Sequence, residues 1–393
     1  FFYKIFGNQD WAFYLLSQIF IVLGFIAVFK LANELFNNDQ LAFLSVILLE
    51  GIYFFNYTSP EFNVNVSQLP FWALSIYFSW RLIKYNKFLD ILLLGLFLAL
   101  GLLSKYLFLY LIFGIYSFFI FLILKRKIKF YKIFFVSLFT LIIISPHLIW
   151  LFENDFVTIT YGLQRTGIDR SLTNHFVFPI IFILKQVGIL LPFLLMSFLL
   201  LKKIKFNKIK FDEKLIFLLF TFLTPIILIT LTSFLTGAKI RTMWMTPFYL
   251  FIGVFFIHIF KKNIILKNLK TFYFIFLFLF FFSPITYTAV SLSNDFKRTD
   301  YPGAEIARLV QNKWDENFSN DIKLVIGDEW YAGNLSYHLK SRPRWAIELK
   351  ENPKNININE GIIYTGNPKV LKDVCPGVFG TIKPVGYCMI GKK

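Results

Sequence analysis

Apolar stretches recur along residues 11–291, and their length constrains the fold more than any other feature of the sequence. A helix needs about 20 consecutive apolar residues to cross the hydrocarbon core of a bilayer. Ten stretches approach this length, at residues 11–30, 41–57, 66–83, 88–103, 106–124, 131–151, 178–201, 214–236, 242–260 and 271–291. Only 16% of the residues are charged, whereas roughly a quarter are charged in soluble domains. We therefore expect an all-α polytopic membrane bundle of about ten spans, which excludes a water-soluble enzyme.

The basic residues fix the expected orientation of the spans. The formal net charge is +18, and residues 1–291 hold 26 basic and 11 acidic residues. With the first span starting outside, the inner connections and span edges hold 19 Lys and Arg and the outer connections hold 5. The outer connections are 58–65, 104–105, 152–177 and 237–241. Lys and Arg are concentrated in the cytoplasmic loops of membrane proteins. The orientation of the helices in the cytoplasmic (inner) membrane therefore explains the excess positive charge, and we predict no nucleic-acid partner.

Residues 292–393 have the composition of a small globular domain, so we divide the chain into a transmembrane domain, 1–291, and an extracytoplasmic α/β domain, 292–393. Helices are expected at 301–310 and 334–340, and strands at 323–327, 361–364 and 377–382. Cys375 and Cys388 both fall here, where a disulfide is permitted on the outer side. Two unpaired small side chains are the alternative.

Two charged residues stand out in the outer connections. Glu61, in Thr58-Ser-Pro-Glu-Phe-Asn, is the only acid of its connection and suits cation binding or proton removal from an acceptor hydroxyl. A solvated loop acid or helix cap is the alternative for Glu61. Lys105, in Gly101-Leu-Leu-Ser-Lys-Tyr, lies in a tight turn against the positive-inside trend and suits a lipid-linked phosphate. Snorkelling to lipid headgroups is the alternative for Lys105.

The outer connection at 152–177 and the end of the preceding span gather further polar groups. They are His147, Glu153, Asp155, Arg165, Asp169 and Arg170. Arg pairs with phosphate in two hydrogen bonds, and acids accept hydrogen bonds from sugar hydroxyls, so this cluster suits an anionic ligand with hydroxyls. His147 alone is more often a satisfied interfacial histidine. A loop of this length without evident structure tends to be functional or disordered.

Lys239 and Arg241 form a second basic segment beside Trp244, which favours a phosphate clamp. Snorkelling cations beside an interfacial Trp are the alternative. Glu50 and Lys185 are the charges that fall clearly within spans, on different helices that allow them to pair. The sequence holds no phosphate-binding Gly loop, no HExxH spacing and no detectable internal repeat, which excludes a nucleotide site of a known kind.

Together these motifs resemble the polyprenyl-phosphate-dependent glycosyltransferases of the GT-C type, the dolichyl-phosphate-mannose protein mannosyltransferase-like group that includes lipid A aminoarabinose transferases. The resemblance is carried by Phe6-Gly-Asn-Gln-Asp-Trp-Ala-Phe, Ser59-Pro-Glu-Phe-Asn, Leu69-Pro-Phe-Trp-Ala-Leu, Leu102-Leu-Ser-Lys-Tyr, Pro146-His-Leu-Ile-Trp, Asp155-Phe, Lys239 to Pro247, Tyr331-Ala-Gly-Asn-Leu-Ser-Tyr-His and Arg342-Pro. It covers essentially the whole chain.

The resemblance implies transfer of a sugar, with inversion, from a polyprenyl-phosphate donor to a glycolipid, glycan or protein acceptor on the outer face of the membrane. Lys105 matches the Lys of the family's Leu-Leu-Ser/Thr-Lys motif, and Arg241, beside Lys239, falls in the segment that contacts the donor phosphate. Glu61 lies where relatives carry a second acid, which in many of them falls closer to Asn65. A divalent metal ion assists in some members; no other cofactor is implied.

The family's main catalytic acid lies in the first outer loop, and this chain starts late in that loop with Phe-Phe-Tyr-Lys and no Met. We therefore expect the first span and that acid upstream of residue 1, because Asp10 matches a helix-entry position. A transporter or flippase of a lipid-linked sugar is the alternative function, and a membrane scaffold is a third. Polar groups concentrated at one face favour the enzyme, because a transporter binds near the midplane between repeats.

Overall fold

The computed structural model describes residues 2–7, 9–166, 171–201, 211–264, 266, 269–293, 301–347 and 360–393. Internal contacts divide the chain into two compact units, Phe1–Thr288 and Ala289–Lys393. Helices make up the first unit, and five strands with helices make up the second.

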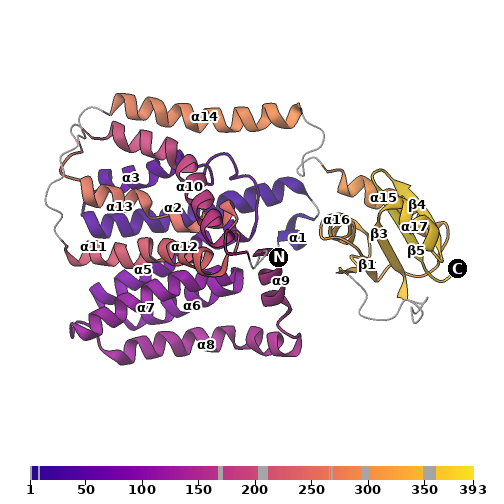
Figure 1. The fold of residues 1–393 in the computed structure, drawn as a ribbon, viewed down its shortest axis with the longest axis horizontal. Helices are drawn as coiled ribbons and strands as arrows, with labels where there is room; N and C mark the ends of the chain where they lie inside the picture. Colours follow the sequence, from indigo (N-terminus) through magenta and orange to yellow (C-terminus); the bar gives the residue numbers. More distant parts are fainter. Residues whose placement is uncertain are drawn as a thin grey trace. The chain divides into compact units, whose positions relative to one another are not determined.

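The long helices of the first unit run roughly parallel to one another (Figure 1). The α-helices are α1 (Phe2–Phe6), α2 (Asp10–Phe36), α3 (Asp39–Ile47), α4 (Val64–Ser67), α5 (Leu69–Tyr85), α6 (Phe88–Ser104), α7 (Leu109–Leu124), α8 (Phe130–Glu153), α9 (Val157–Thr166), α10 (Asn174–Leu199), α11 (Glu213–Leu218), α12 (Thr224–Thr236), α13 (Ile252–Phe260) and α14 (Lys270–Leu292). Short segments of other helix types are η1 (Leu48–Gly51), η2 (Tyr106–Phe108), η3 (Leu219–Leu223), η4 (Thr242–Met245) and η5 (Pro247–Tyr249).

Polar residues set where these helices begin and end. The Asn38 side chain caps α3 by accepting from the backbone N–H of Leu41 at 3.0 Å, which satisfies one of the donors that a helix start leaves unpaired. Asn86 and Gly237 follow α5 and α12 in the left-handed conformation, with φ of 55° and 66°. Short polar residues and glycine adopt this conformation most readily, which is why they end helices.

The described residues contain fewer helices able to span a membrane than the ten that the sequence predicts. Among the described residues, six helices are long and apolar enough to cross a membrane, and a seventh if Thr242–Tyr249 and Ile252–Phe260, which meet at 52°, form one broken span. The stretch 41–57 is helical only to Gly51. At 1.5 Å per residue, the 17 residues of α5 or α6 extend about 25 Å, less than the roughly 30 Å of hydrocarbon.

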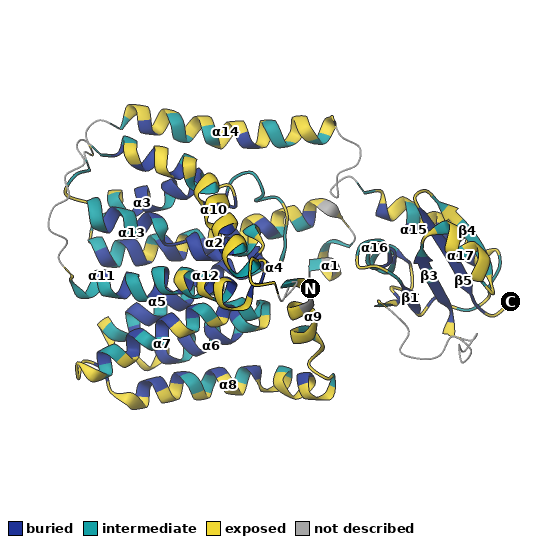
Figure 2. Ribbon diagram, in the orientation of Figure 1, coloured by how far each residue is buried: buried dark blue, intermediate teal, exposed yellow. Residues whose placement is uncertain are grey.

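The surface of the first unit is that of an integral membrane protein. Large apolar side chains are exposed along α10 and α14 (Figure 2), including Phe176, Leu184, Phe274 and Phe281. A water-soluble protein does not expose apolar faces of this extent. The chain is therefore an integral membrane protein, as the composition predicts.

Aromatic rings form the part of the core of the first unit that lies next to the turn after α6. The Trp72 ring packs 4.7 Å from that of Phe248 and 5.5 Å from that of Phe108, between ring centroids. A Cβ on Gly101 would lie 2.3 Å from the Phe108 ring. The missing side chain thus lets the chain fold back tightly after α6. Elsewhere, a Cβ on Gly253 would lie 2.2 Å from the carbonyl oxygen of Ser45, so α13 packs backbone to backbone against α3.

The second unit is a small α/β fold. Its elements are α15 (Gly303–Asp315), β1 (Leu324–Ile326), α16 (Tyr331–His338), β2 (Arg344–Ala346), β3 (Ile362–Gly366), α17 (Pro368–Val374), β4 (Val378–Ile382) and β5 (Val385–Ile390). The sheet has the order β2-β1-β3-β5-β4, with β2, β1 and β3 parallel and the last two pairs antiparallel. The fold class predicted for this region is confirmed, although the sequence prediction omitted β2, β5 and α17.

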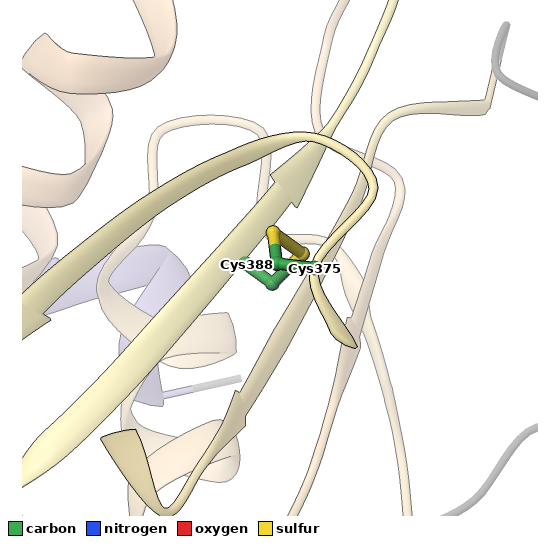
Figure 3. Close-up of a disulfide and its surroundings, with 2 residues drawn as sticks. All are labelled: Cys375 and Cys388. Atoms are coloured by element: carbon green, nitrogen blue, oxygen red, sulfur yellow. A yellow bond between two sulfur atoms is a disulfide. The ribbon is translucent and has the colours of Figure 1, made fainter. Parts of the chain in front are cut away.

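The two cysteines of the chain are joined in this unit. Cys375, which follows α17, forms a disulfide with Cys388 of β5 (Figure 3). Tyr364 and Phe379 are the register partners of Cys388 on the two neighbouring strands. The disulfide therefore ties α17 to the middle of the antiparallel part of the sheet, and the question that the sequence left open is answered in favour of the bridge.

Candidate functional site

Connections far apart in the sequence meet at one end of the first unit, where α4 and α9 also lie (Figures 1 and 2). The Ser17 hydroxyl donates to the carbonyl of Ser59 at 2.6 Å. The backbone N–H of Lys239 donates to the carbonyl of Thr166 at 3.1 Å. The first bond ties the connection 58–65 to α2, and the second joins the connections 152–177 and 237–241 directly.

Lys105 is the central residue of this end. Its backbone is extended, and its carbonyl accepts a 2.9 Å hydrogen bond from the side chain of Gln68, which is fully buried. The Lys105 ammonium donates to Oδ1 of Asn65 at 2.6 Å and lies 4.8 Å from the centroid of the Trp244 ring. Gln68 therefore fixes the backbone while a neutral oxygen and an aromatic face hold the charge.

The local fold of α4 aims Asn65 at the ammonium. The Asn63 side chain accepts from the backbone N–H groups of Asn65 and Val66, at 2.9 and 3.3 Å, and so caps this short helix. Asn65 is buried, with 3% of its surface exposed. Helix α4 leads directly into α5, whose Trp72 belongs to the core. The packing of α5 in the core therefore holds the side-chain oxygen of Asn65 in place.

Further positive charges surround Lys105. Burial, followed by the charges of Arg241 and Arg165, lowers the pKa of Lys105 to about 7. Arg241 is exposed and directly precedes η4, which carries Trp244. In the part of the chain that the structure describes, no carboxylate forms an ion pair with Lys105 or Arg241. An anion that entered here would meet cations without competing acids, which is the requirement for binding a phosphate.

Lys239 lies beside this group, at the junction of α9 and α10. Its side chain is exposed, and its ammonium lies 6.0 Å from the centroid of the Phe178 ring. Its backbone bond to Thr166 links the basic segment at 239–241 to the end of α9. The two basic segments of the outer connections are therefore neighbours, as a shared ligand would require.

His147 enters a network that the sequence does not reveal. Its Nε2 lies 2.7 Å from the hydroxyl of Tyr106, and that hydroxyl lies 2.7 Å from Oγ1 of Thr158. The His147 ring stacks on Trp150 at a centroid distance of 5.7 Å. Tyr106 directly follows Lys105, so the network reaches the residue next to the buried ammonium. The sequence signal for Tyr106 was its position in the Leu-Leu-Ser-Lys-Tyr motif.

The acidic candidates are dispersed. Glu61 lies exposed in a turn before α4, where its carbonyl accepts from the Asn63 side chain at 3.0 Å. Glu153 ends α8, and Asp155 follows with a φ of 50°; both are exposed. Asp169 and Arg170 are outside the described residues.

The described residues do not supply the ligands of a metal ion. No group of three His, Cys, Asp or Glu side chains that could hold a metal is found within the described ranges.

The two intramembrane charges predicted from the sequence do not pair in the structure. Oε1 of Glu50 accepts from the Asn56 side chain at 2.6 Å, and the same Asn56 nitrogen lies 3.4 Å from the carbonyl oxygen of Leu279 in α14. Lys185 lies on the exposed surface of α10. Glu50 thus helps to hold the irregular segment after η1, whereas Lys185 faces outward.

The chain combines a helical membrane unit that has a cationic site at one end with a following α/β unit. Residues 1–150 match the family model described as dolichyl-phosphate-mannose-protein mannosyltransferase. These observations confirm the resemblance inferred from the sequence motifs.

A solved structure extends the similarity to the rest of the chain. The fold is similar to the crystal structure of ArnT from Cupriavidus metallidurans bound to undecaprenyl phosphate, with a TM-score of 0.59 and 11% identity. The match covers 98% of this chain and 85% of that one. At this identity the similarity shows the fold. No curated protein matches the sequence.

Proposed function

We propose that this protein is a glycosyltransferase that moves a sugar from a polyprenyl-phosphate donor to an acceptor hydroxyl. One observation carries the proposal: the half-buried Lys105 ammonium is held by Asn65 and Trp244, with Arg241 and Arg165 close by. The family match of residues 1–150 and the ArnT-like fold support the same chemistry. ArnT was crystallised with undecaprenyl phosphate bound, and a polyprenyl phosphate is the kind of ligand that these cations would take.

The cations fit the charge that develops in such a reaction. A sugar-linked polyprenyl phosphate is a diester with one negative charge. When the bond between the sugar C1 and the phosphate oxygen breaks, the lipid leaves as a monoester that carries about −1.5 to −2 charge at pH 7. Lys105, Lys239 and Arg241 would therefore bind the departing phosphate more strongly than the donor, which lowers the barrier.

The acceptor oxygen attacks C1 from the face opposite the phosphate, so the sugar is inverted. We assign Glu61 as a second carboxylate that takes part in removing the acceptor proton, because it is exposed at the same end as Lys105. Glu153, Asp155, Arg165, Asp169 and Arg170 are assigned to the loop that binds the acceptor or the donor, and His147, at the end of α8, is assigned to the network that holds this loop. A glycolipid, a glycan or a protein with a free hydroxyl would each serve as acceptor in this scheme.

We place the reaction on the outer face of the cytoplasmic membrane, with residues 292–393 extracytoplasmic. The disulfide between Cys375 and Cys388 supports this side, because disulfides persist in oxidising compartments. The basic connections at the opposite end of the helical unit support it as well, because such loops remain in the cytoplasm.

The test is transfer of radiolabelled sugar from polyprenyl-phosphate donors in membranes that contain the full chain. We expect Lys105→Ala to lower transfer by about a hundredfold or more, the effect of removing a group that stabilises transition-state charge. Glu61→Gln should lower it by a similar factor of about a hundred if Glu61 is the base. Lys185→Ala is the matched control, because this exposed lysine of α10 lies outside the site.

Two results would count against the proposal. Equal activity of the Lys105→Ala and Lys185→Ala variants at equal expression would remove Lys105 from the site. Movement of lipid-linked sugar across the membrane without consumption of donor would show that the protein is a transporter and not an enzyme. Lys185, as a charge within a span, would then be a candidate functional residue.

A further inference from the structure

The hydroxyl of Tyr106 joins three separate segments. Tyr106 begins η2, its neighbour His147 lies in α8, and Thr158 lies in the first turn of α9. Both contacts of the hydroxyl are 2.7 Å long, and Tyr106 directly follows Lys105 in the chain. The first turn of α9 is thereby fixed to the segment that carries the buried ammonium.

The other end of α9 is also attached. The carbonyl of Thr166, its last residue, accepts from the backbone N–H of Lys239 at 3.1 Å. Lys239 belongs to the same short basic segment as Arg241. Helix α9 thus reaches from the Lys105 connection to the Lys239 connection, with a hydrogen-bonded contact at each end.

Between these contacts α9 buries little of its own surface. Val157, Ile159 and Leu163 are exposed, and most of the helix is coloured as exposed in Figure 2. A helix of ten residues is marginal by itself, since isolated helices shorter than about 12 to 15 residues are barely stable in water. Its position therefore depends strongly on the contacts at its two ends.

The connection into α9 adds to this dependence. Asp155 and Phe156 have positive φ values, 50° and 54°, although neither is glycine. Non-glycine residues adopt this conformation at an energetic cost, and they keep it only where surrounding contacts hold them. The contact between Tyr106 and Thr158 lies directly after this strained pair.

Helix α9 carries one charge that bears on the candidate site. The guanidinium of Arg165 lies 5.0 Å from the centroid of the Tyr161 ring, one turn earlier in the same helix. The positive charge of Arg165 acts on the Lys105 ammonium together with that of Arg241. The position of α9 therefore sets how strongly Arg165 contributes to the field at Lys105.

We propose that α9 is a strap that holds Arg165 at the Lys105 site for the phosphate of the lipid-linked donor, and that Tyr106 and His147 are positioning residues that hold the strap. This inference rests on the proposed function for the identity of the ligand. It assigns Tyr106 and His147 no contact with the reacting atoms. Their effect passes through Thr158 and α9 to Arg165.

The first measurement is hydrogen–deuterium exchange of the amides of α9 in the full-length protein. Tyr106→Phe removes one hydroxyl, and we expect exchange within 157–166 to become severalfold faster, because a hydrogen bond contributes about 1 kcal/mol. The control is Tyr116→Phe, since the Tyr116 hydroxyl forms the same kind of bond, 2.8 Å to Ser137, between α7 and α8. Unchanged exchange in α9 of the Tyr106→Phe variant would overturn the strap, whatever the activity.

The second measurement is the donor KM and kcat of single and double variants. We expect Tyr106→Phe to raise the donor KM about fivefold, again the value of one hydrogen bond, with little change in kcat. In an Arg165→Ala background the same change should have no further effect on KM, because Tyr106 acts through Arg165. Additive effects of the two substitutions would contradict that route.

The His147 contact offers a rescue. His147→Gln keeps a polar nitrogen or oxygen at a similar reach, so its donor KM should stay near that of the unchanged protein, whereas His147→Ala should behave like Tyr106→Phe. If no variant, nor the unchanged protein, consumes donor, the proposed function fails while the exchange measurement still decides on the strap. If donor is consumed and Tyr106→Phe matches Tyr116→Phe in every readout, the strap fails and the proposed function stands.

Discussion

The two ends of the helical unit treat their cations differently. At the end that lacks Lys105, several of the described basic side chains are paired with acids. These pairs are Arg81 with Asp90, Lys84 with Glu34 and Lys127 with Glu213. At the other end, the ammonium of Lys105 has the neutral oxygen of Asn65 and the face of Trp244 as its partners.

The two ends thus differ in the role of their charges: at one end charges join parts of the fold, and at the other end charge is available to a ligand. A cation paired with a carboxylate is neutralised, and its role is to join two elements. A cation held by an amide oxygen and an aromatic ring is positioned without being neutralised by an acid. Without a bound anion, keeping the Lys105 ammonium charged costs free energy, as the lowered pKa of Lys105 indicates.

Breaking a pair at the paired end should have the largest effect, and it should act on stability. Asp90 is 1% exposed and accepts from Nε of Arg81 at 2.8 Å, which joins α5 to α6. We expect Asp90→Ala to lower the free energy of unfolding by about 2 kcal/mol, because Arg81, whose side chain is 25% exposed, loses a charge-assisted hydrogen bond to a buried partner. Thermal unfolding in detergent would measure it.

Lys84→Ala is the control for that substitution, because the bridge from Lys84 to Glu34 lies at the surface, where such pairs contribute about 1 kcal/mol or less. Equal losses of stability in the two variants would show that burial of the Arg81–Asp90 pair does not matter.

Giving the Lys105 end an acid should make the two ends alike. Asn65→Asp places a carboxylate at the position of the oxygen that now lies 2.6 Å from the ammonium. We expect the donor KM to rise about tenfold, a loss of roughly 1.4 kcal/mol of binding free energy, because the new ion pair competes with the phosphate. Titration of the donor in the transfer assay measures this.

Asn63→Asp is its matched control. Aspartate is as good a helix cap as asparagine, and the Asn63 oxygen bonds to backbone N–H groups rather than to the ammonium. The control loses only the hydrogen bond from the Asn63 amide nitrogen to the carbonyl of Glu61. A tenfold loss in the control as well would mean that negative charge near α4, rather than neutralisation of Lys105, weakens binding.

The pH dependence of donor binding should sharpen the comparison with a smaller effect. Because the pKa of Lys105 is lowered to about 7, the ammonium is charged below that pH and loses its proton above it. The phosphate binds the charged form, so the donor KM should rise severalfold between about pH 6 and about pH 8. Lys105→Arg should flatten this rise, because arginine stays charged. An unchanged slope in that variant would assign the titration to another group.

The apolar pattern predicted the long, exposed helices closely. The spans expected at 131–151 and 271–291 are α8, Phe130–Glu153, and α14, Lys270–Leu292. The pattern failed at 41–57, where the helix stops at Gly51. A Cβ on Gly51 would lie 2.7 Å from the backbone of Phe193, and the Asn56 side chain satisfies the carbonyl of Glu50. Irregular backbone is tolerated at membrane depth where the protein itself pairs it, and hydropathy does not register such contacts.

The candidate site was predictable only in part for a similar reason. The tight turn after α6 predicted that Lys105 is confined, and the structure shows it there. Its partner Asn65 lies 40 residues away, and the bond from Tyr106 to Thr158 joins residues 52 apart. No local pattern in the sequence specifies contacts at such separations, because they arise from the packing of α4, α8 and α9 around the same end.

The close approach of Gly253 to Ser45 has a consequence for how the protein is made. Synthesis delivers α3 to the membrane long before the ribosome reaches α13. At nine residues, α3 is too short to cross a bilayer, and the backbone against which its Ser45 carbonyl packs does not yet exist. The packing of α3 is therefore completed only after α13 has been synthesised. A chain released before residue 253 would leave α3 without this neighbour and exposed to quality-control proteases.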